Sequence, residues 1–410
     1  MPTVQITSEI GPLRDVLVHE PGKEVLAVTP GTRSDFLYED IIELDTAGSE
    51  HRTMVAVLER FADVHQTRAL LREIAEHDEV RKLLAARTAF AAPSGNLAKE
   101  LVDRPAERLV EMLIEGTEEK TGPIARTLNR GGYCLPPLPN LFFMRDVGIV
   151  IDTSVVIGSM RHEARWSEEL LIKALFLHHP LLENQGILYD GSEERRLDYR
   201  IEGGDVHPVR EDLLILGLSD RTSAVALDNL CDLVFEGSGV TDVVIVVMPG
   251  QPTAIHLDMI FAQVDRGLCV ISPPQFLGPA RLAVLHKRKG QSSVREMANF
   301  FEALKEVDFG LEPILCGGGQ RQLQEREQWA SGCNVLMLRP GVGLAYRRNE
   351  ATLAEFEKAG FRIVQAERFL LGEEDIEDGE RAVITMKGSE RVRGGGGPRC
   401  MTLPLRRDPL

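Results

Sequence analysis

The first strong pattern along the chain is a block with helical periodicity that starts near residue 49. Val55, Leu58 and Ala62 recur at the spacing of one helix face, and apolar residues continue this spacing through Leu84. Glutamate, arginine and lysine fill the positions between them. This arrangement of apolar and charged positions predicts a run of amphipathic helices.

Two further signals mark a helix later in the same block. Pro105 is typical of a helix start, and Gly116 is typical of the residue at which a helix ends. A loop rich in glycine and proline, 129–139, then closes the block. We therefore expect residues 49–130 to form an inserted helical domain, while residues 1–48 and 131–410 form the main α/β domain.

Outside this block, the chain repeats a unit made of a strand, a turn and a second strand. Three of the later units lead into an arginine and then a predicted helix. The strands are expected within 13–18, 148–158, 213–217, 268–271 and 335–346, and the helices at 166–176, 224–234 and 351–359. Units that recur at intervals of about 50–75 residues suggest radial repetition, as in an α/β propeller. The alternative is an ordinary mixed α/β sheet.

Composition and charge narrow the class of partner. The chain of 410 residues is 43% hydrophobic and 27% charged, which is ordinary for a globular protein. Its net charge of −16 argues against a nucleic-acid partner or an anionic membrane surface, and is compatible with a small cationic substrate. The sequence has no long apolar run and no signal-like start, so we expect a cytoplasmic protein. Its six cysteines include no CxxC pair and fit reduced thiols.

The last of these cysteines, Cys400, ends the sequence RVRGGGGPRC. Only a thiolate is a good nucleophile, and nearby positive charge favours the thiolate. Four successive glycines allow the backbone to approach a ligand closely. The alternative interpretation is a frayed tail with an incidental cysteine.

Four other polar residues occupy the front end of their repeated units: Asp146, Glu202, His256 and Asp258. If the units are arranged radially, these residues face Cys400 in one pocket. Such a set can supply a nucleophile, a base, a carboxylate that orients the base, and two carboxylates that bind substrate. Glu202 would raise the pKa of His256 and keep this imidazole available as a general acid.

The same set of residues favours a guanidinium substrate. Asp146 and Asp258 together offer four carboxylate oxygens, which match the planar hydrogen-bonding geometry of a guanidinium group. Arg165 and Arg221 each lie at a predicted helix start and can hold a carboxylate in the same way. A substrate with a free carboxylate is therefore favoured over agmatine.

A competing interpretation of the histidine motif is a metal site. His256 and Asp258 would share one face of a strand and, with His286, could ligate iron in a two-histidine, one-carboxylate site. The helix-bearing units argue against the jelly-roll fold that such a site would need. His178 and His179 are better explained as a helix cap.

Taken together and in order, four motifs resemble arginine deiminase. They are NLFFMRD at 140–146, EGGDV at 202–206, HLD at 256–258 and GGPRCM at 396–401. The resemblance extends from residue 9 over nearly the whole chain and includes the helical insertion. It implies the five-bladed α/β propeller of the pentein, or guanidine-modifying, superfamily. It also implies hydrolysis of L-arginine to citrulline and ammonia without a cofactor.

The resemblance implies a role for each matching residue. Cys400 would be the nucleophile, His256 the proton shuttle and Glu202 the residue that orients it. Asp146 and Asp258 would bind the guanidinium nitrogens. The implied substrate-binding residues are Asn140, Arg165 and Arg221 at the carboxylate, Phe143 in the pocket wall, and Asp205 of the EGGD motif. We expect no cofactor or metal, no nucleic-acid or membrane partner, and a homo-oligomer.

One position departs from the family pattern. Gly395 stands where the family usually has a second loop arginine, which affects substrate affinity and identity more than the chemistry. The residues leave several activities open: an arginine dihydrolase, an amidinotransferase, another guanidine hydrolase, or a non-catalytic arginine-binding protein.

Overall fold

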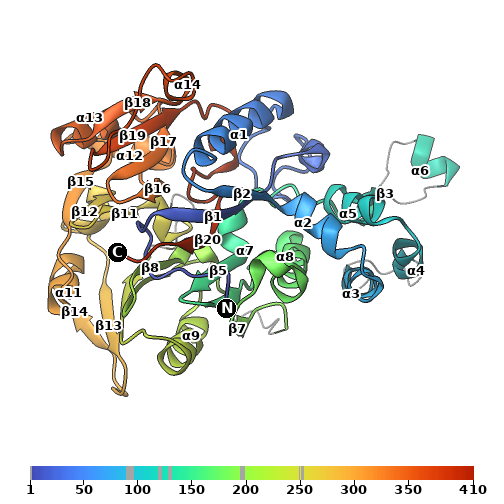
Figure 1. Ribbon diagram of the computed structural model, residues 1–410, viewed down its shortest axis with the longest axis horizontal. Coiled ribbons are helices and arrows are strands. Elements are labelled where there is room, and N and C mark those ends of the chain that lie inside the picture. The colour runs from blue at the N-terminus through green and yellow to red at the C-terminus, as the bar shows by residue number, and fades with distance from the viewer. Residues whose placement is uncertain are drawn as a thin grey trace.

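The computed structural model of the protein describes residues 2–88, 97–118, 122–127, 132–193, 199–248, 250 and 254–410. Figure 1 shows a mixed α/β fold in which several small sheets lie side by side, with helices around them. The described strands form five sheets of three to five strands and one two-stranded sheet. The predicted domain boundary at residues 130 and 131 lies outside the described residues.

The five larger sheets share one topology. In each, a central strand has two neighbours. It is antiparallel to one of them and parallel to the other, and the parallel strand follows a helix in the chain. The first sheet joins the two ends of the chain, because β20 (Leu403–Arg407) and β2 (Asp63–Gln66) both pair with β1 (Leu13–Val18). The corresponding strands of the other sheets are β5 (Gly148–Ile151), β6 (Ser154–Ile157) and β7 (Ile187–Asp190); β8 (Val206–Arg210), β9 (Leu213–Leu218) and β10 (Asp242–Val247); β11 (Phe261–Asp265), β12 (Leu268–Ile271) and β15 (Glu312–Leu315); and β16 (Leu336–Arg339), β17 (Val342–Tyr346) and β19 (Ala382–Met386).

Two of these sheets carry additional strands. The third continues from β10 through β13 (Val284–Arg288) to β14 (Arg295–Met297), and β18 (Arg362–Gln365) pairs with β19 in the fifth. The strands predicted from sequence all lie on members of the five sheets, and their hydrophobic residues are buried except for Leu268, which is partly buried. The repetition seen in the sequence is therefore a repetition of one sheet topology.

Helices connect the central strand of each sheet to its parallel neighbour. The three helices predicted from sequence are present as α8 (Trp166–His178), α9 (Ala224–Gly237) and α13 (Glu350–Lys358). The other helices of the α/β part are α1 (Leu44–Leu58), α7 (Met144–Val147), α10 (Pro273–Phe276), α11 (Phe300–Glu306), α12 (Arg321–Trp329) and α14 (Ala366–Leu370).

The segment predicted to be helical is helical over most of its described length, with one difference. Five helices lie together on one side of the molecule, at the right in Figure 1: α2 (Thr67–Ile74), α3 (Asp78–Thr88), α4 (Leu97–Val102), α5 (Ala106–Glu115) and α6 (Pro123–Thr127). The helical pattern does not continue through Ala62, because α1 ends at Leu58 and residues 63–66 form β2. These four residues pair with β1 through their backbones, an interaction that side-chain periodicity does not reveal. The short strands β3 (Thr117–Glu118) and β4 (Tyr133–Leu135) pair with each other near the end of the segment.

The helical segment shares a hydrophobic core with the sheets. One cluster of buried side chains includes Leu71 of α2 and Leu113 of α5, together with Leu171 and Leu175 of α8 and Leu403 of β20. In the described part of the chain, no helix is long and apolar enough to cross a membrane.

This shared core predicts that the helical segment unfolds together with the sheets. Replacing Leu113, which is 2% exposed, by alanine removes buried apolar volume and should lower the free energy of unfolding by about 2–5 kcal/mol. Both tryptophans, Trp166 and Trp329, lie outside the segment. In Leu113→Ala, the denaturant midpoint measured by tryptophan fluorescence should therefore shift by the same amount as the midpoint measured by far-UV circular dichroism. An unchanged fluorescence transition would contradict the shared core, and Ile124→Ala, at a side chain 77% exposed, is the matched control.

Candidate active site

Several residues of the candidate site lie where the chain enters the antiparallel strand at the edge of each sheet. Asp146 is in α7, directly before β5, and Asp258 is in the short 3-10 helix Leu257–Met259, directly before β11. Asp205 precedes β8, Asn334 precedes β16, and Cys400 precedes β20. The shared topology thus gives five equivalent chain segments, and all five carry a polar residue or a cysteine.

These five segments contact one another in sequence. The backbone N–H of Arg145 donates to the carbonyl of Cys400 at 3.0 Å. The carbonyl oxygen of Arg145 packs against Gly203 of the following segment, where a Cβ built on the glycine would lie only 2.0 Å from this oxygen. The Leu257 N–H then donates to Asp205 Oδ1 at 2.8 Å.

Asn334 completes this set of contacts. Its Nδ2 donates to the carbonyl of Asp258 at 3.3 Å and lies 3.0 Å from Cys400 Sγ. Its Oδ1 accepts from the Cys400 N–H at 3.1 Å. The five segments therefore close into a ring around the thiol.

Cys400 is buried in surroundings that favour the thiol over the thiolate. The side chain is 5% exposed, and Sγ donates to Asp258 Oδ2 at 3.3 Å. Burial, followed by the negative charges of Asp258 and Asp146, raises the pKa of Cys400 well above its ordinary value. Arg399 acts in the opposite direction and lowers this pKa, but burial and the two carboxylates outweigh it. The sequence left open whether burial or positive charge would prevail at Cys400, and in this arrangement burial does.

The three arginines of the cysteine loop are directed elsewhere. Arg393 is exposed and pairs with Asp40 at 2.8 Å, and Arg391 lies among methionine sulfurs. Arg399 binds Asp258 and Glu9. None of the three forms a hydrogen bond with the Cys400 sulfur within the described structure.

His256 and Glu202 form a buried pair beside Cys400. Nε2 of His256 lies 2.8 Å from Glu202 Oε2, as the sequence analysis predicted. Burial by itself lowers the pKa of His256, but the charge of Asp146 and the hydrogen bond to Glu202 outweigh burial and raise this pKa to about 9. The imidazole is therefore protonated at neutral pH. Glu202 also binds Arg221, whose NH1 lies 3.2 Å from Oε2.

Asp146 and Asp258 each have one carboxylate oxygen that accepts a hydrogen bond and one that does not. Arg165 donates to Asp146 Oδ2 at 2.7 Å, and Arg399 donates to Asp258 Oδ2 at 2.8 Å. The Oδ1 atoms of both aspartates are buried without a hydrogen-bond partner in the described structure, although His256 Nδ1 lies 3.7 Å from Asp146 Oδ1 as an ion-pair neighbour. An unsatisfied buried carboxylate oxygen is costly, so both atoms favour a cationic hydrogen-bond donor.

These side chains enclose a small cavity, which we call the inner chamber, of about 40 Å³. Its lining includes Asp146, His256 and Cys400, together with Leu37 and Gly395 from two loops. The chamber is small, and the groups that would carry the chemistry lie in its wall.

The predicted substrate-binding residues fall into two groups. Asn140, Phe143, Arg165 and Arg221 line the inner chamber. Asp205 does not: it is fully buried behind the chamber, and its oxygens accept hydrogen bonds from the Leu257 N–H and the Ser219 hydroxyl. Asp205 therefore positions the backbone next to His256 and does not itself reach a ligand.

Arg165 is bound by the protein itself in this structure. Its guanidinium donates to Glu168 and Asp146 and to the carbonyls of Asn140 and Phe143. Because a buried arginine needs compensating acceptors, these contacts orient Asp146 and leave no free pair of donors for a substrate carboxylate. Arg221 differs, since its Nε is buried without a hydrogen-bond partner in the described structure.

Comparison with known proteins identifies the family. A model described as arginine deiminase matches residues 34–407. The chain belongs to the arginine deiminase family. It is 31% identical over 437 residues to an arginine deiminase of Treponema denticola, with 100% of both chains covered. It is 30% identical over 430 residues to an arginine deiminase of Bacillus cytotoxicus, with 99% of both chains covered.

Solved structures of other proteins share this fold. The N-terminal domain of ArgZ, an arginine dihydrolase from the ornithine–ammonia cycle in cyanobacteria, was solved bound to product. It matches with a TM-score of 0.53 and 13% identity, covering 96% of this chain and 97% of that one. SxtG, an amidinotransferase from Microseira wollei, matches with a TM-score of 0.53 and 14% identity, covering 100% and 98%. These likenesses show the fold alone.

The structure does not bring together the residues of the alternative iron site. His286 lies on β13 and binds Asp242 at 2.7 Å. In the described part of the chain, the one group of three residues whose ligand atoms lie close enough for a metal ion is Asp146, Glu202 and His256. The proposed set of His256, Asp258 and His286 is therefore not brought together.

Two site residues of this arginine deiminase family member escaped the sequence analysis. Asn334, which binds both the Sγ and the N–H of Cys400, follows a buried cysteine in a hydrophobic segment. Its position before the first strand of a repeated unit was the available signal. Glu9, which holds Arg399 through both carboxylate oxygens, lies near the N-terminus, far from Arg399 in sequence.

The Glu202 contact predicts the titration of His256. In Glu202→Gln the negative partner is lost, so the pKa of His256 should fall from about 9 toward, or below, its ordinary 6.5. NMR titration of histidine-labelled protein, with His256 assigned from its absence in His256→Ala, measures this shift. The exposed Glu211→Gln is the control and should leave the midpoint in place. An equal midpoint in parent and Glu202→Gln would contradict the assigned contact.

Proposed function

We propose that the protein hydrolyses L-arginine to citrulline and ammonia through a covalent intermediate on Cys400. The observation that carries this proposal is the pair of unbonded oxygens, Asp146 Oδ1 and Asp258 Oδ1, buried next to an uncharged thiol and a protonated imidazole. A guanidinium is a planar cation that can donate to both oxygens at once. Membership of the arginine deiminase family supports the same substrate.

Binding of the substrate prepares the nucleophile. The guanidinium brings a positive charge between Asp146 and Asp258, the two groups that hold the pKa of Cys400 high. This charge stabilises the thiolate, so Cys400 loses its proton to solvent as the substrate binds. The nucleophile is thus formed only where the electrophilic carbon is already in place.

The reaction then proceeds in two halves. The thiolate attacks the guanidinium carbon, His256 protonates one terminal nitrogen, and the carbon–nitrogen bond breaks to release ammonia. Water adds to the resulting thiouronium carbon while neutral His256 takes a proton from it. The sulfur–carbon bond breaks, citrulline leaves, and the remaining hydroxyl proton restores the thiol. The proton lost at the start appears with ammonia as ammonium.

The same proposal includes the finer architecture. We infer a five-bladed α/β propeller from the five sheets of like topology and from the ring of contacts among the five segments that enter them. Residues 1–48 and 131–410 would form this catalytic unit. The insertion 49–130 would contribute α2–α6, although β2 ties part of it to the first sheet. Catalysis without a cofactor, a cytoplasmic location and assembly into a homo-oligomer remain predictions from the sequence.

The direct test is product analysis of purified protein supplied with L-arginine. The parent should release citrulline and one ammonia per turnover. Cys400→Ala should release neither while still binding L-arginine in isothermal titration calorimetry, because both aspartates remain. Ornithine with two ammonia per turnover would indicate a dihydrolase instead. Absence of any product from the parent would contradict the proposal and favour an arginine-binding protein.

The close packing of Gly204 against His256 gives a second test. A Cβ at Gly204 would lie 2.6 Å from the imidazole, so Gly204→Ala must displace the ring that moves the protons. A displacement of this kind should lower kcat about 100-fold. Gly319→Ala is the matched control, since a Cβ there meets nothing within 4 Å. Equal kcat values for the two variants would argue against His256 as the proton shuttle.

A further inference from the structure

A second, much larger cavity lies directly outside the inner chamber. This outer cavity has a volume of about 1320 Å³. It shares six lining residues with the inner chamber: Leu37, Arg221, Ile255, Met259, Gly394 and Gly395. The outer cavity is therefore the space into which the rest of a substrate extends once its guanidinium is at Cys400.

The outer cavity is larger than free L-arginine requires. Ligand pockets for molecules of drug size occupy roughly 300–1,000 Å³. Beyond the guanidinium and its alkyl chain, L-arginine has only an amino group and a carboxylate left to place. The volume of the outer cavity therefore suits a substrate that continues past the α-carbon.

Six arginine and lysine side chains line this cavity beside four acidic ones, so its lining has an excess of positive charge although the chain carries a net charge of −16. Arg348 and Lys387 line it and form no hydrogen bond or ion pair with the described residues. Arg347 and Arg393 also line it, each held by a carboxylate, of Glu367 and Asp40 respectively. The two cations without partners favour a ligand that bears a carboxylate.

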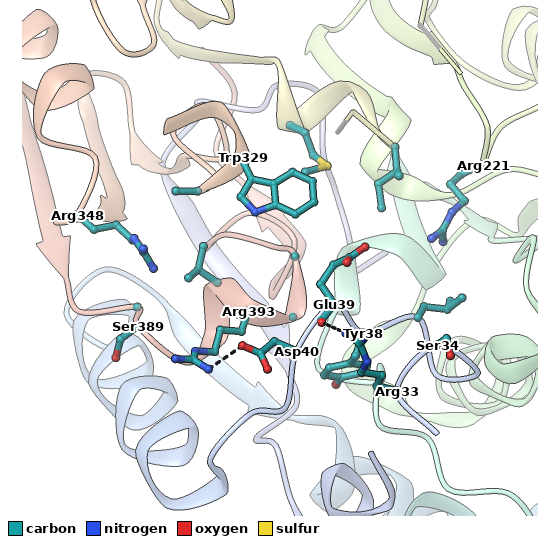
Figure 2. Close-up of a pocket in the computed structure, with 18 of the residues that line it drawn as sticks. Arg33, Ser34, Tyr38, Glu39, Asp40, Arg221, Trp329, Arg348, Ser389 and Arg393 are labelled. Atoms are coloured by element: carbon teal, nitrogen blue, oxygen red, sulfur yellow. Dashed lines mark hydrogen bonds and ion pairs between the residues drawn. The ribbon is translucent and has the colours of Figure 1, made fainter. Parts of the chain in front are cut away.

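Trp329 adds an apolar surface between the charged walls. Its side chain lies at the end of α12 and is 46% exposed. Figure 2 shows the indole ring between Arg348 on one side and Arg221 on the other, with both arginine side chains directed toward the middle of the cavity. An exposed tryptophan beside cations is suited to contact the chain of a peptide.

Gly395 leaves the passage between the two cavities open. Its backbone has a φ of 90°, and a Cβ built there would meet nothing within 4 Å. Gly395 lines both cavities, so at this position no side chain stands between them.

We propose that the outer cavity binds an extension at the α-carbon of the substrate, and that the preferred substrates include arginyl peptides with an acidic residue next to arginine. This inference rests on the proposed function, since the guanidinium chemistry is the same. The arginine side chain of the peptide would gain one oxygen from water and lose one nitrogen as ammonium, and the peptide bond would stay intact.

The test compares kcat/KM for L-arginine, L-arginyl-L-glutamate and L-arginyl-L-lysine, with mass spectrometry of the intact dipeptides to identify the ureido product. The parent should convert both dipeptides and prefer the glutamate peptide. In Arg348→Glu, the ratio of kcat/KM for the glutamate peptide to that for L-arginine should fall about tenfold, because attraction becomes repulsion. Arg266→Glu makes the same change of charge at an exposed site outside the cavity and should leave this ratio unchanged.

Trp329→Ala provides a second variant that does not change the charge. It should lower the ratio of kcat/KM for either dipeptide to that for L-arginine, because the apolar contact is lost for both peptides.

The outcomes separate this inference from the proposed function. Hydrolysis of L-arginine with no conversion of either dipeptide would overturn the inference and leave the proposed function standing. The inference would also be overturned if the ratio of kcat/KM for each dipeptide to that for L-arginine were the same in the parent, Arg348→Glu and Trp329→Ala. Failure of the parent to convert any of the three compounds would overturn both. Conversion of the dipeptides but not of free L-arginine would support the extended site and correct the substrate.

Discussion

Negative charge buried next to an uncharged thiol is the constraint on which the rest of this site depends. Asp146 and Asp258 lie close enough to Cys400 to raise the pKa of its thiol, and each retains one unbonded oxygen. Placing carboxylates in the interior is unfavourable unless a cation compensates them. The protein supplies Arg165 and the protonated His256 to Asp146, and Arg399 to Asp258, and a guanidinium substrate would add a further cation between them.

Further acids balance these arginines in turn. Glu168 binds Arg165, and Glu9 binds Arg399 through both of its oxygens. These contacts hold both aspartates in fixed orientations, and the Oδ1 atom of each is left to accept a hydrogen bond from a ligand. This arrangement explains why so many buried charges surround a reaction that needs only a thiol, an imidazole and two hydrogen-bond acceptors. The charges position the groups that react.

Much of this could be predicted from sequence because it follows local patterns. Hydrophobic runs located the strands, and the arginine that follows three of the repeated units marked the starts of α8, α9 and α13. The pair of Glu202 and His256 followed from the chemistry that an imidazole needs. The repeated unit was visible because each copy places a polar residue just before its first strand.

What sequence did not reveal depends on contacts between distant segments. The carboxylates that occupy Arg165 and Arg399, and the contact of Asn334 with the thiol, form only when different sheets come together. For the same reason, the sequence left open whether Cys400 is a thiol or a thiolate, because the outcome depends on burial and on the carboxylates that Arg399 binds in the folded chain. Strand β2 was missed because backbone pairing with β1 defines it, not its own side chains.

The measurement that most directly tests the central claim is the pKa of Cys400 in the free enzyme. The rate of its alkylation by iodoacetamide, followed across pH by mass spectrometry of the peptide that contains Cys400, reports the thiolate fraction. We predict that the rate is still rising above pH 9, the ordinary pKa of a cysteine thiol, and that Asp258→Asn moves the rise to lower pH. A rate that reaches a plateau near neutral pH would show that Cys400 rests as a thiolate and would contradict the account.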